Sequence, residues 1–324
     1  MFIALGLFNF FIYYFLSQKL DVTLKIIFGV LFFFISFIFM VNVDVSKMPD
    51  YQAYFAVIGT SEPELSIKTL FAEPYYFQLV NLFAKSHSTE FSIKIFYYIN
   101  FILTSSFFIW LACMKDISVW KKMLLYALYY YFFSYVLLRN TPAYILVGLL
   151  FYTLQKNEFL KISVLSFMAH LTALPIIAFS VFKNKKADIY LFLFVLLYMY
   201  FFKFIINLNL LDLYSRLSVY QENQDGPSIF HKLYFGLFIG INIFLFFKNK
   251  ALILNYTYIF LFATYLIFQF INPVMGYRFS IYLVMYILLS PNFNFEIKTE
   301  KVLNYCSLLV LGCFLIFNIK YLFT

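Results

Sequence analysis

Two ionisable side chains stand in strongly apolar surroundings near the middle of the sequence. Arg139 lies at the edge of one apolar segment, and His170 lies deep inside the next one, at 160–182. An ionisable side chain at membrane depth costs free energy unless it faces protein or a water-filled cavity. Both residues are therefore candidates for a function beyond packing.

Arg139 is followed by Asn140, Thr141 and Pro142. This order predicts the start of a helix, with a polar cap residue and then a proline in the first turn, where its missing N–H donor costs nothing. The guanidinium would lie beside a helix N-terminus, whose free backbone donors attract anions. The arrangement suits a phosphate or diphosphate. The alternative is an arginine that only extends to the membrane interface.

A similar pattern recurs at 272–278. Asn272 and Pro273 predict a short polar turn, after which Arg278 begins another apolar segment. Two arginines on one membrane face could clamp one diphosphate. Arg216 is a third candidate for binding the diphosphate, although its polar loop is also typical of a solvated surface charge.

His170 lies about nine residues beyond Lys161, which is roughly 13 Å at 1.5 Å per residue and places it near the membrane centre. Pro175 follows shortly afterwards and interrupts the helix. A lone histidine on an apolar helix is often a packing residue. The neighbouring break favours a histidine that lines a cavity and takes part in proton transfer.

Two carboxylates, Asp50 and Glu73, are embedded among aromatic residues in the segment 43–91. Shielding by apolar neighbours raises the pKa of a carboxyl group, which allows it to act as a general base near neutral pH. Tyrosines beside them could stack on a sugar, although tyrosines are also common at membrane interfaces. These tyrosines are Tyr51, Tyr54, Tyr75 and Tyr76.

The composition is that of a membrane protein. Of the 324 residues, 64% are hydrophobic and only 12% are charged. The apolar runs approach the roughly 20 residues that a helix needs to cross a bilayer core about 30 Å thick. We expect an all-α polytopic fold of about 10–11 transmembrane helices. The runs are 1–16, 25–42, 92–114, 122–138, 142–154, 160–182, 188–207, 230–247, 251–271, 277–290 and 302–321.

Lysine marks most connections between the apolar runs, which places them on the cytoplasmic side by the positive-inside rule. These connections are 17–24, 115–122, 155–161, 183–187, 248–250 and 291–301. All of them can be cytoplasmic only if the segment 160–182 enters the membrane and returns to the same side. We therefore expect a broken, re-entrant segment there, with its break near His170. The alternative is a simple crossing that puts 183–187 outside.

On this topology the outer face receives a long segment at about 43–91 and a second loop at about 208–229. Loops of such length are usually functional. No internal repeat or linker divides the chain, so we expect one integral membrane domain over 1–324. The formal charge of +9 is scattered between apolar runs, a distribution that does not support a nucleic-acid surface.

The sequence lacks the motifs of several common enzyme classes. The sequence has no Walker loop, no GxGxxG, no HExxH and no GxSxG, so ATP hydrolysis, nicotinamide chemistry, zincin proteolysis and α/β-hydrolase chemistry are unsupported. It also has no DxD pair to hold a metal–nucleotide-sugar complex. Three cysteines, Cys113, Cys306 and Cys313, have neither metal-binding nor disulfide spacing. We expect no metal and no cofactor.

Taken together, these residues resemble the pattern of the EpsG-like and Wzy-type bacterial polysaccharide (O-antigen) polymerases. The likeness spans residues 40–290 and consists of short elements: Asp50, Tyr51 and Tyr54; Glu73, Tyr75 and Tyr76; Arg139; Ala169 and His170; and Arg278 and Tyr282. The resemblance implies a GT-C-like helical bundle in the bacterial inner (cytoplasmic) membrane.

The resemblance also implies a glycosyltransferase that joins oligosaccharide repeat units carried on undecaprenyl diphosphate, on the periplasmic side, with a chain-length regulator protein as a partner. A lipid diphosphate is already a good leaving group and needs only cations to neutralise it. Arg139 and Arg278 would supply these cations. Either Asp50 or Glu73 would accept the proton of the attacking hydroxyl, with His170 as the next candidate or as an organiser of the cavity.

Other functions use related chemistry. A lipid-oligosaccharide flippase or transporter also places cations in a helical bundle near a lipid phosphate, but transporters often contain internal repeats. An O-antigen ligase, which moves finished polymer onto another acceptor, uses the same donor as a polymerase. A membrane acyltransferase is a more distant alternative.

Overall fold

The computed structural model describes residues 1–48, 50–52, 54–55, 75, 79, 87–155, 173, 176, 229–271, 273–291 and 293–323. Within these ranges the regular structure is helical, without a strand, which confirms the all-α prediction. The chain forms two compact units, Met1–Leu171 with Leu288–Thr324, and Thr172–Ile287. We call them unit 1 and unit 2 and describe each by itself. The single integral domain expected over 1–324 stays a prediction.

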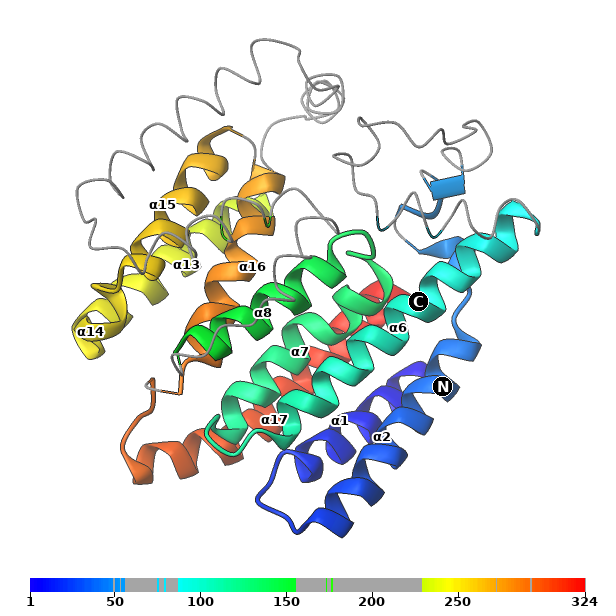
Figure 1. Ribbon diagram of the computed structural model, residues 1–324, viewed down its shortest axis with the longest axis horizontal. Coiled ribbons are helices and arrows are strands. Elements are labelled where there is room, and N and C mark those ends of the chain that lie inside the picture. Colours follow the sequence, from blue (N-terminus) through cyan, green and yellow to red (C-terminus); the bar gives the residue numbers. More distant parts are fainter. Residues whose placement is uncertain are drawn as a thin grey trace. The chain divides into compact units, whose positions relative to one another are not determined.

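Unit 1 is a bundle of long helices (Figure 1). Its elements are α1 (Phe2–Leu16), α2 (Val22–Asn42), the short 3-10 helix η1 (Val45–Lys47), α6 (Thr89–Cys113), α7 (Val119–Tyr135), α8 (Thr141–Gln155) and α17 (Ile297–Phe323). The apolar runs that fall in the described ranges are helical, with ends mostly within a few residues of those expected, except that the run 251–271 is divided into two helices, Lys250–Ile253 and Tyr256–Ile271. The segment 160–182, apart from residues 173 and 176, and the 208–229 loop lie outside the described residues.

Helix α7 is the centre of unit 1. It packs between α6 and α17 and also contacts α1, while α1 packs against both α2 and α17 (Figure 1). Most side chains of α7 are buried. Two of its rings stack with a ring of α1: Tyr13 of α1 stacks on Tyr126 at 4.5 Å, and Tyr126 stacks on Tyr130 at 4.7 Å. Aromatic stacking of this kind adds to the stabilisation from burial.

Hydrogen bonds between side chains join the buried helices. Asn9 Nδ2 donates to Ser36 Oγ at 2.8 Å and to the hydroxyl of Tyr126 at 3.1 Å, which links α1, α2 and α7. Ser105 and Tyr130 share a further bond of 3.0 Å between α6 and α7. Apolar burial cannot drive association where lipid surrounds the helices, so packing and interhelical hydrogen bonds of this type hold a membrane bundle together.

The outward faces of unit 1 are apolar. On α2 the side chains of Ile26, Val30 and Phe34 recur every four residues and are 61%, 63% and 57% exposed. A stripe of this kind is unusual on a soluble surface and suits contact with lipid. Among the described helices, α2, α6 and α17 are long and apolar enough to cross a membrane. The chain is therefore an α-helical membrane protein.

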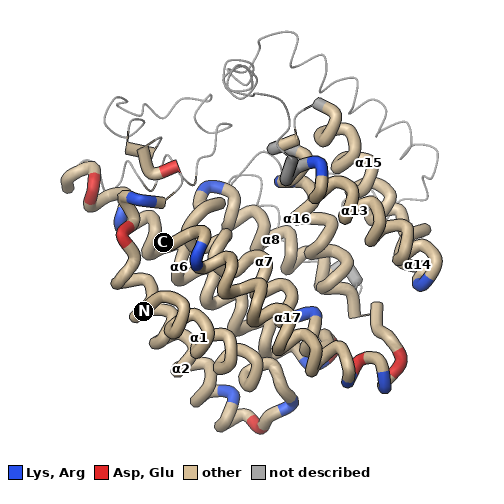
Figure 2. The backbone as a smooth tube through the Cα atoms, turned by 180° about the vertical axis from the view of Figure 1, so that it is seen from behind, with Lys and Arg blue, Asp and Glu red and all other residues tan. Residues whose placement is uncertain are grey.

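The connections 17–24, 115–122 and 291–301 meet at one end of unit 1, where their residues line a common cavity. Charged residues of this unit lie at or near helix ends and leave long uncharged stretches between them (Figure 2). The expectation that these three lysine-containing connections share one side of the membrane agrees with this arrangement. We call this end of unit 1 the lysine end.

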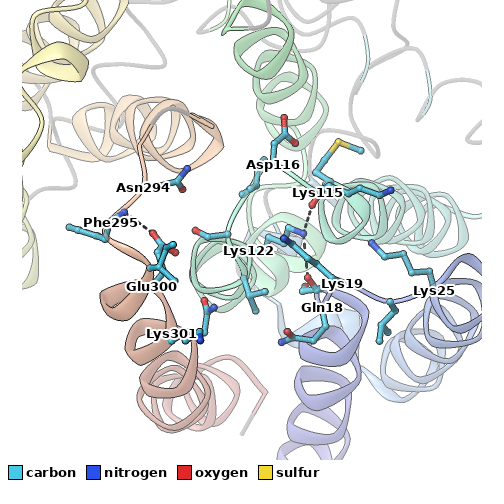
Figure 3. Close-up of a pocket in the computed structure, with 18 residues that line it drawn as sticks. Gln18, Lys19, Lys25, Lys115, Asp116, Lys122, Asn294, Phe295, Glu300 and Lys301 are labelled. Atoms are coloured by element: carbon cyan, nitrogen blue, oxygen red, sulfur yellow. Dashed lines mark hydrogen bonds between the residues drawn. The ribbon is translucent and has the colours of Figure 1, made fainter.

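Two lysines at the start of α7 organise the lysine end. Lys122, only 2% exposed, donates from Nζ to Ala112 O at 2.9 Å, to Met114 O, and to Ser17 O at 3.4 Å (Figure 3). These carbonyls belong to the C-terminal ends of α6 and α1. Lys121, fully buried, donates to Ser290 O at 2.8 Å.

From the sequence, Lys121 and Lys122 were expected only to mark the cytoplasmic side of the membrane. Their second role is to satisfy the carbonyl groups that helix C-termini leave without partners. An ammonium group, with three donors, serves several such carbonyls at once.

Unit 2 contains α13 (Ile229–Lys248), the single turn α14 (Lys250–Ile253), α15 (Tyr256–Ile271) and α16 (Pro273–Leu289), whose last two residues belong to unit 1. Helices α15 and α16 approach closely: Phe268 stacks on Phe279 at 4.3 Å, and a Cβ atom at Gly276 would lie 2.7 Å from the Cα atom of Gln269. Only glycine permits this approach.

Removing the ammonium group of Lys122 should destabilise the fold. Lys122→Met retains most of the side-chain volume but leaves the α6 and α1 carbonyls without their donor, so we expect the free energy of unfolding to fall by about 1–3 kcal/mol. Unfolding of the detergent-solubilised chain measures the effect. Lys115→Met, at an exposed position on the same connection, is the control, and equal destabilisation of both variants would contradict the capping role.

Cysteine labelling tests which side of the membrane the lysine end faces. In a variant without Cys113, Cys306 and Cys313, we expect single cysteines at Lys19 and Lys115 to react with a membrane-impermeant maleimide only after the cells are permeabilised, and a cysteine at Ser46 to react in intact cells. The positive-inside rule gives this direction. Labelling of Lys19 and Ser46 from the same side would refute the topology.

Candidate functional site

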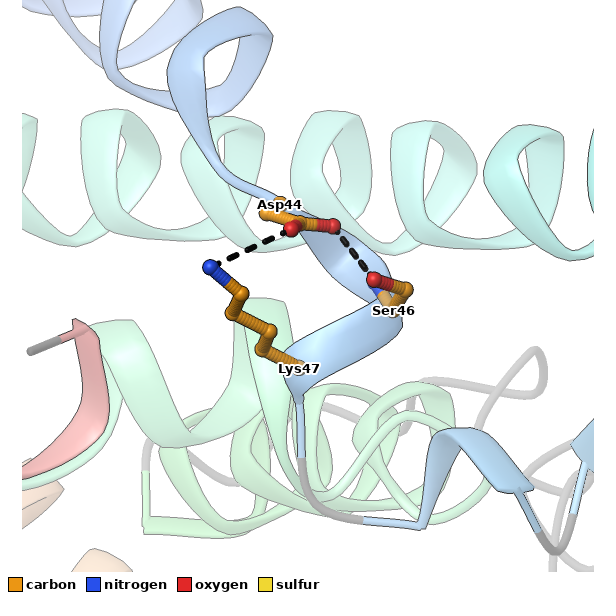
Figure 4. A network of polar contacts seen from close by, with 3 residues as sticks. All are labelled: Asp44, Ser46 and Lys47. Atoms are coloured by element: carbon orange, nitrogen blue, oxygen red, sulfur yellow. Dashed lines mark hydrogen bonds and ion pairs between the residues drawn. The ribbon is translucent and has the colours of Figure 1, made fainter.

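The chain leaves α2 through a short fixed turn at the end of unit 1 away from the lysine end. Asp44 Oδ1 accepts hydrogen bonds from Ser46 Oγ at 2.6 Å and Ser46 N at 3.2 Å, and Asp44 Oδ2 pairs with Lys47 Nζ at 3.6 Å (Figure 4). The bond from the Ser46 side chain is the main cause that lowers the pKa of the Asp44 carboxyl group. An aspartate in this position stabilises the turn because its side chain replaces backbone partners.

Asp50 follows with φ = 64°, a left-handed conformation that aspartate tolerates better than most residues. The backbone N–H of Tyr54 donates to Asp50 O at 2.9 Å, and the side chains of Tyr51 and Tyr54 are buried. The Asp50 side chain itself is exposed. Apolar shielding of its carboxyl group, which we expected from the neighbouring aromatic residues, is therefore absent because those rings turn into the bundle and leave the carboxylate outside.

The turn between α7 and α8 presents Arg139. Helix α7 ends at Tyr135 and α8 begins at Thr141, so Asn140 directly precedes the helix and Pro142 lies in its first turn, as predicted. Thr141 Oγ1 donates to Phe133 O at 2.8 Å and to Leu137 O at 3.0 Å, which ties the start of α8 to the end of α7. This brace holds Arg139 beside the α8 N-terminus.

Arg139 contacts Tyr54, a residue of the segment 43–91. The guanidinium carbon of Arg139 lies 5.8 Å from the ring centroid of Tyr54, within cation–π range. Tyr54 packs edge-on against Phe96 of α6 at 5.8 Å, and Tyr75 lies against the same ring at 5.7 Å. We call Tyr54, Tyr75, Phe96 and Arg139 the outer cluster. Tyr54, Tyr75 and Arg139 were expected on one membrane face from the sequence, whereas Phe96 was not, because no pattern distinguishes it from the other phenylalanines.

One polar atom near the outer cluster, the buried Oδ1 of Asn140, has no hydrogen-bond partner among the described residues. Burial raises the pKa of Tyr75, so its hydroxyl stays neutral and can both donate and accept. Buried polar groups without partners are rare and mark places where a ligand or water completes the bonding.

The outer cluster combines a permanent cation and two tyrosines, and beside it lie the N-terminus of α8 and the unpaired acceptor Oδ1 of Asn140. A cation at a helix N-terminus suits a phosphate, and an aromatic ring beside hydrogen-bonding groups suits a sugar. Asp50 is separated from Tyr54 by one turn of chain and adds an exposed carboxylate. The chemistry of the outer cluster therefore fits a glycosyl phosphate better than an apolar ligand.

Other predicted site residues lie elsewhere. Arg278 belongs to unit 2 and is half-buried in the second turn of α16, because Pro273 already begins that helix. The turn expected at 272–276 is therefore wrong: proline is favoured in the first turn of a helix, and α16 starts with it. Since Arg139 belongs to unit 1, a clamp of two arginines stays a prediction. Glu73, Tyr76, His170 and Arg216 lie outside the described residues.

No group of three His, Cys, Asp or Glu side chains that could hold a metal ion occurs within the described ranges. Comparison of the chain with protein-family models, with curated proteins and with solved structures finds no match. The function is therefore argued from the residues themselves.

The contact between Arg139 and Tyr54 should be measurable as a coupling energy. In a double-mutant cycle of Arg139→Ala and Tyr54→Leu, we expect about 0.5–2 kcal/mol of coupling in the free energy of unfolding, measured in mixed detergent micelles. Tyr54→Phe retains the ring and should retain most of the coupling. Strict additivity of the alanine and leucine changes would show that the contact does not exist in the folded chain.

Proposed function

We propose that this chain is a glycosyltransferase of the bacterial inner membrane that polymerises undecaprenyl-diphosphate-linked oligosaccharide repeat units on the periplasmic side, as in O-antigen, capsule or exopolysaccharide synthesis. The observation that supports it most directly is the contact of Arg139 with Tyr54 beside the α8 N-terminus. It puts a diphosphate-binding cation next to a sugar-stacking ring at the end opposite to the lysines.

In the proposed reaction, the bond between the anomeric carbon and the diphosphate oxygen of the donor breaks, and its electron pair stays on the diphosphate. The acceptor hydroxyl of a second lipid-linked unit forms the new bond to that carbon and releases its proton to a carboxylate. Arg139 neutralises the charge that develops on the leaving group. Asp50 is the proposed base, because its carboxylate is exposed and lies one turn of chain from Tyr54.

The remaining parts of the proposal use further residues, of which Glu73, Tyr76, His170 and Arg216 lie outside the described ranges. Arg278 and Arg216 would add charge to the diphosphate site, Glu73 is the rival base, and His170 would organise a cavity beside a re-entrant segment at 160–182. Tyr51 and Tyr76 complete the sugar-stacking set. The proposed bundle has about 10–11 crossings, in line with the number of apolar runs.

A deletion strain of the source bacterium decides between the proposed polymerase and its alternatives. Loss of a polymerase leaves single repeat units attached to the cell envelope, loss of a flippase leaves none, and loss of a ligase leaves free lipid-linked polymer. We expect single units on a gel ladder. Either of the other two patterns would contradict the proposal.

Complementation of that strain tests the residues. Arg139→Ala should lower polymer formation at least about 100-fold because the leaving diphosphate loses its cation. Asp50→Asn, which keeps a side chain that tolerates the left-handed conformation, should lower it about 100-fold or more. Lys94→Gln, an exposed charge change on α6 near the same end, should leave the ladder unchanged. Long polymer from both Asp50→Asn and Glu73→Gln would refute a carboxylate base.

A further inference from the structure

A cavity of about 570 Å³ opens at the lysine end of unit 1 (Figure 3). It lies among the α1–α2 connection, the α6–α7 connection and the start of α17. Its wall contains five lysines, namely Lys19, Lys25, Lys115, Lys122 and Lys301, against two carboxylates, Asp116 and Glu300. The proposed glycosyltransferase chemistry uses none of these residues.

The two carboxylates can offset only part of the charge of the five lysines. Glu300 accepts hydrogen bonds from Trp120 Nε1 and from the backbone N–H of Phe295, both at 2.8 Å. Asp116 accepts from the hydroxyl of Tyr152 at 2.8 Å.

Among the described residues, no ion pair involves any of the five lysines. Lys122 and Lys25 direct their ammonium groups at backbone carbonyls, with Lys25 Nζ 3.4 Å from Cys113 O. These contacts satisfy their hydrogen-bonding donors but supply no full negative charge. The cavity therefore has an excess of positive charge.

Neutral polar groups in the wall also lack partners. Gln18 Nε2 and Ser118 Oγ are buried and form no hydrogen bond with any described residue. The amide nitrogen can only donate, and the hydroxyl can also donate. Unpaired donors beside incompletely compensated lysines favour a ligand that is an anion with several acceptor oxygens.

We propose that this cavity binds a phosphate-bearing anion on the cytoplasmic side of the membrane. A phosphate presents three acceptor oxygens and negative charge, which matches the unpaired donors and the lysines together. The volume exceeds that of one phosphate and falls in the range of sites that hold a phosphate with an attached organic group. The source is either the headgroup of an anionic phospholipid or a free phosphate compound, and both share this chemistry.

Thermal unfolding of the full chain in lipid discs tests the proposal. Inorganic pyrophosphate is added to discs of phosphatidylcholine in one arm, and discs that contain phosphatidylglycerol are used in the other. A ligand that binds only the folded chain raises the unfolding temperature. A rise with pyrophosphate that persists in Arg139→Ala identifies a free phosphate compound bound at the lysine end, and a rise confined to phosphatidylglycerol identifies the headgroup. No rise in either arm overturns the proposal.

Variants that remove lysine charges test whether the anion binds in the cavity. The double variant Lys25→Gln with Lys301→Gln removes two cavity lysines but spares Lys122, which caps helix ends, and should weaken the apparent affinity about thirtyfold. Lys298→Gln makes the same kind of change at an exposed position on the same turn of α17, outside the cavity, and should keep the original affinity. Equal weakening by the control would reduce the effect to diffuse surface charge and overturn the proposal.

Discussion

The fold of unit 1 depends on ammonium groups buried among backbone carbonyls. A helix N-terminus has partial positive charge, so two lysines in the first turns of α7 are unfavourable for that helix alone. The C-terminal ends of α1 and α6 and the residue after α16 offset this cost, because their carbonyls accept from Lys121 and Lys122. Breaking either contact would leave a charge buried without compensation. The lysine pair thus requires these helix ends to meet at one point.

This requirement also positions the opposite end. Helix α7 has 17 residues and spans about 25 Å at 1.5 Å per residue, so it connects the lysine pair to the turn that holds Arg139. Helix α2 makes the same passage and leads into the segment whose Tyr54 lies beside Arg139. Phe96 on α6 and Arg139 at the start of α8 thus belong to or adjoin helices whose other ends are held in unit 1. Sites on rigid elements hold their geometry better than sites on free loops.

The helices of this fold could be predicted from the sequence, and their burial could not. An apolar run of membrane length predicts a helix whatever surrounds it, so α2 and α7 are equally visible. Lipid and protein interior are both apolar, however, so hydrophobic periodicity does not separate the exposed α2 from the buried α7. The hydrogen bond between Asn9 and Tyr126 could not be predicted either, because the sequence does not show which faces of the apolar helices are buried. The lysines at the start of α7 did offer a signal, since their position is unfavourable for their own helix dipole.

The two ends of unit 1 use different cations, and the difference is chemical. At the outer end a single arginine lies over a tyrosine ring, a contact that suits the flat, weakly hydrated guanidinium, which can still bind a diphosphate in a bidentate way. At the lysine end several ammonium groups surround a cavity and share carbonyl and hydroxyl neighbours, a setting that suits compact point charges on flexible stems. In the proposed function Arg139 would give directional recognition of one group, whereas the lysines would provide a positive field that an anion can satisfy in several orientations. A site that must align a bond for cleavage needs the first kind of cation, which is why the outer cluster is the better candidate for catalysis.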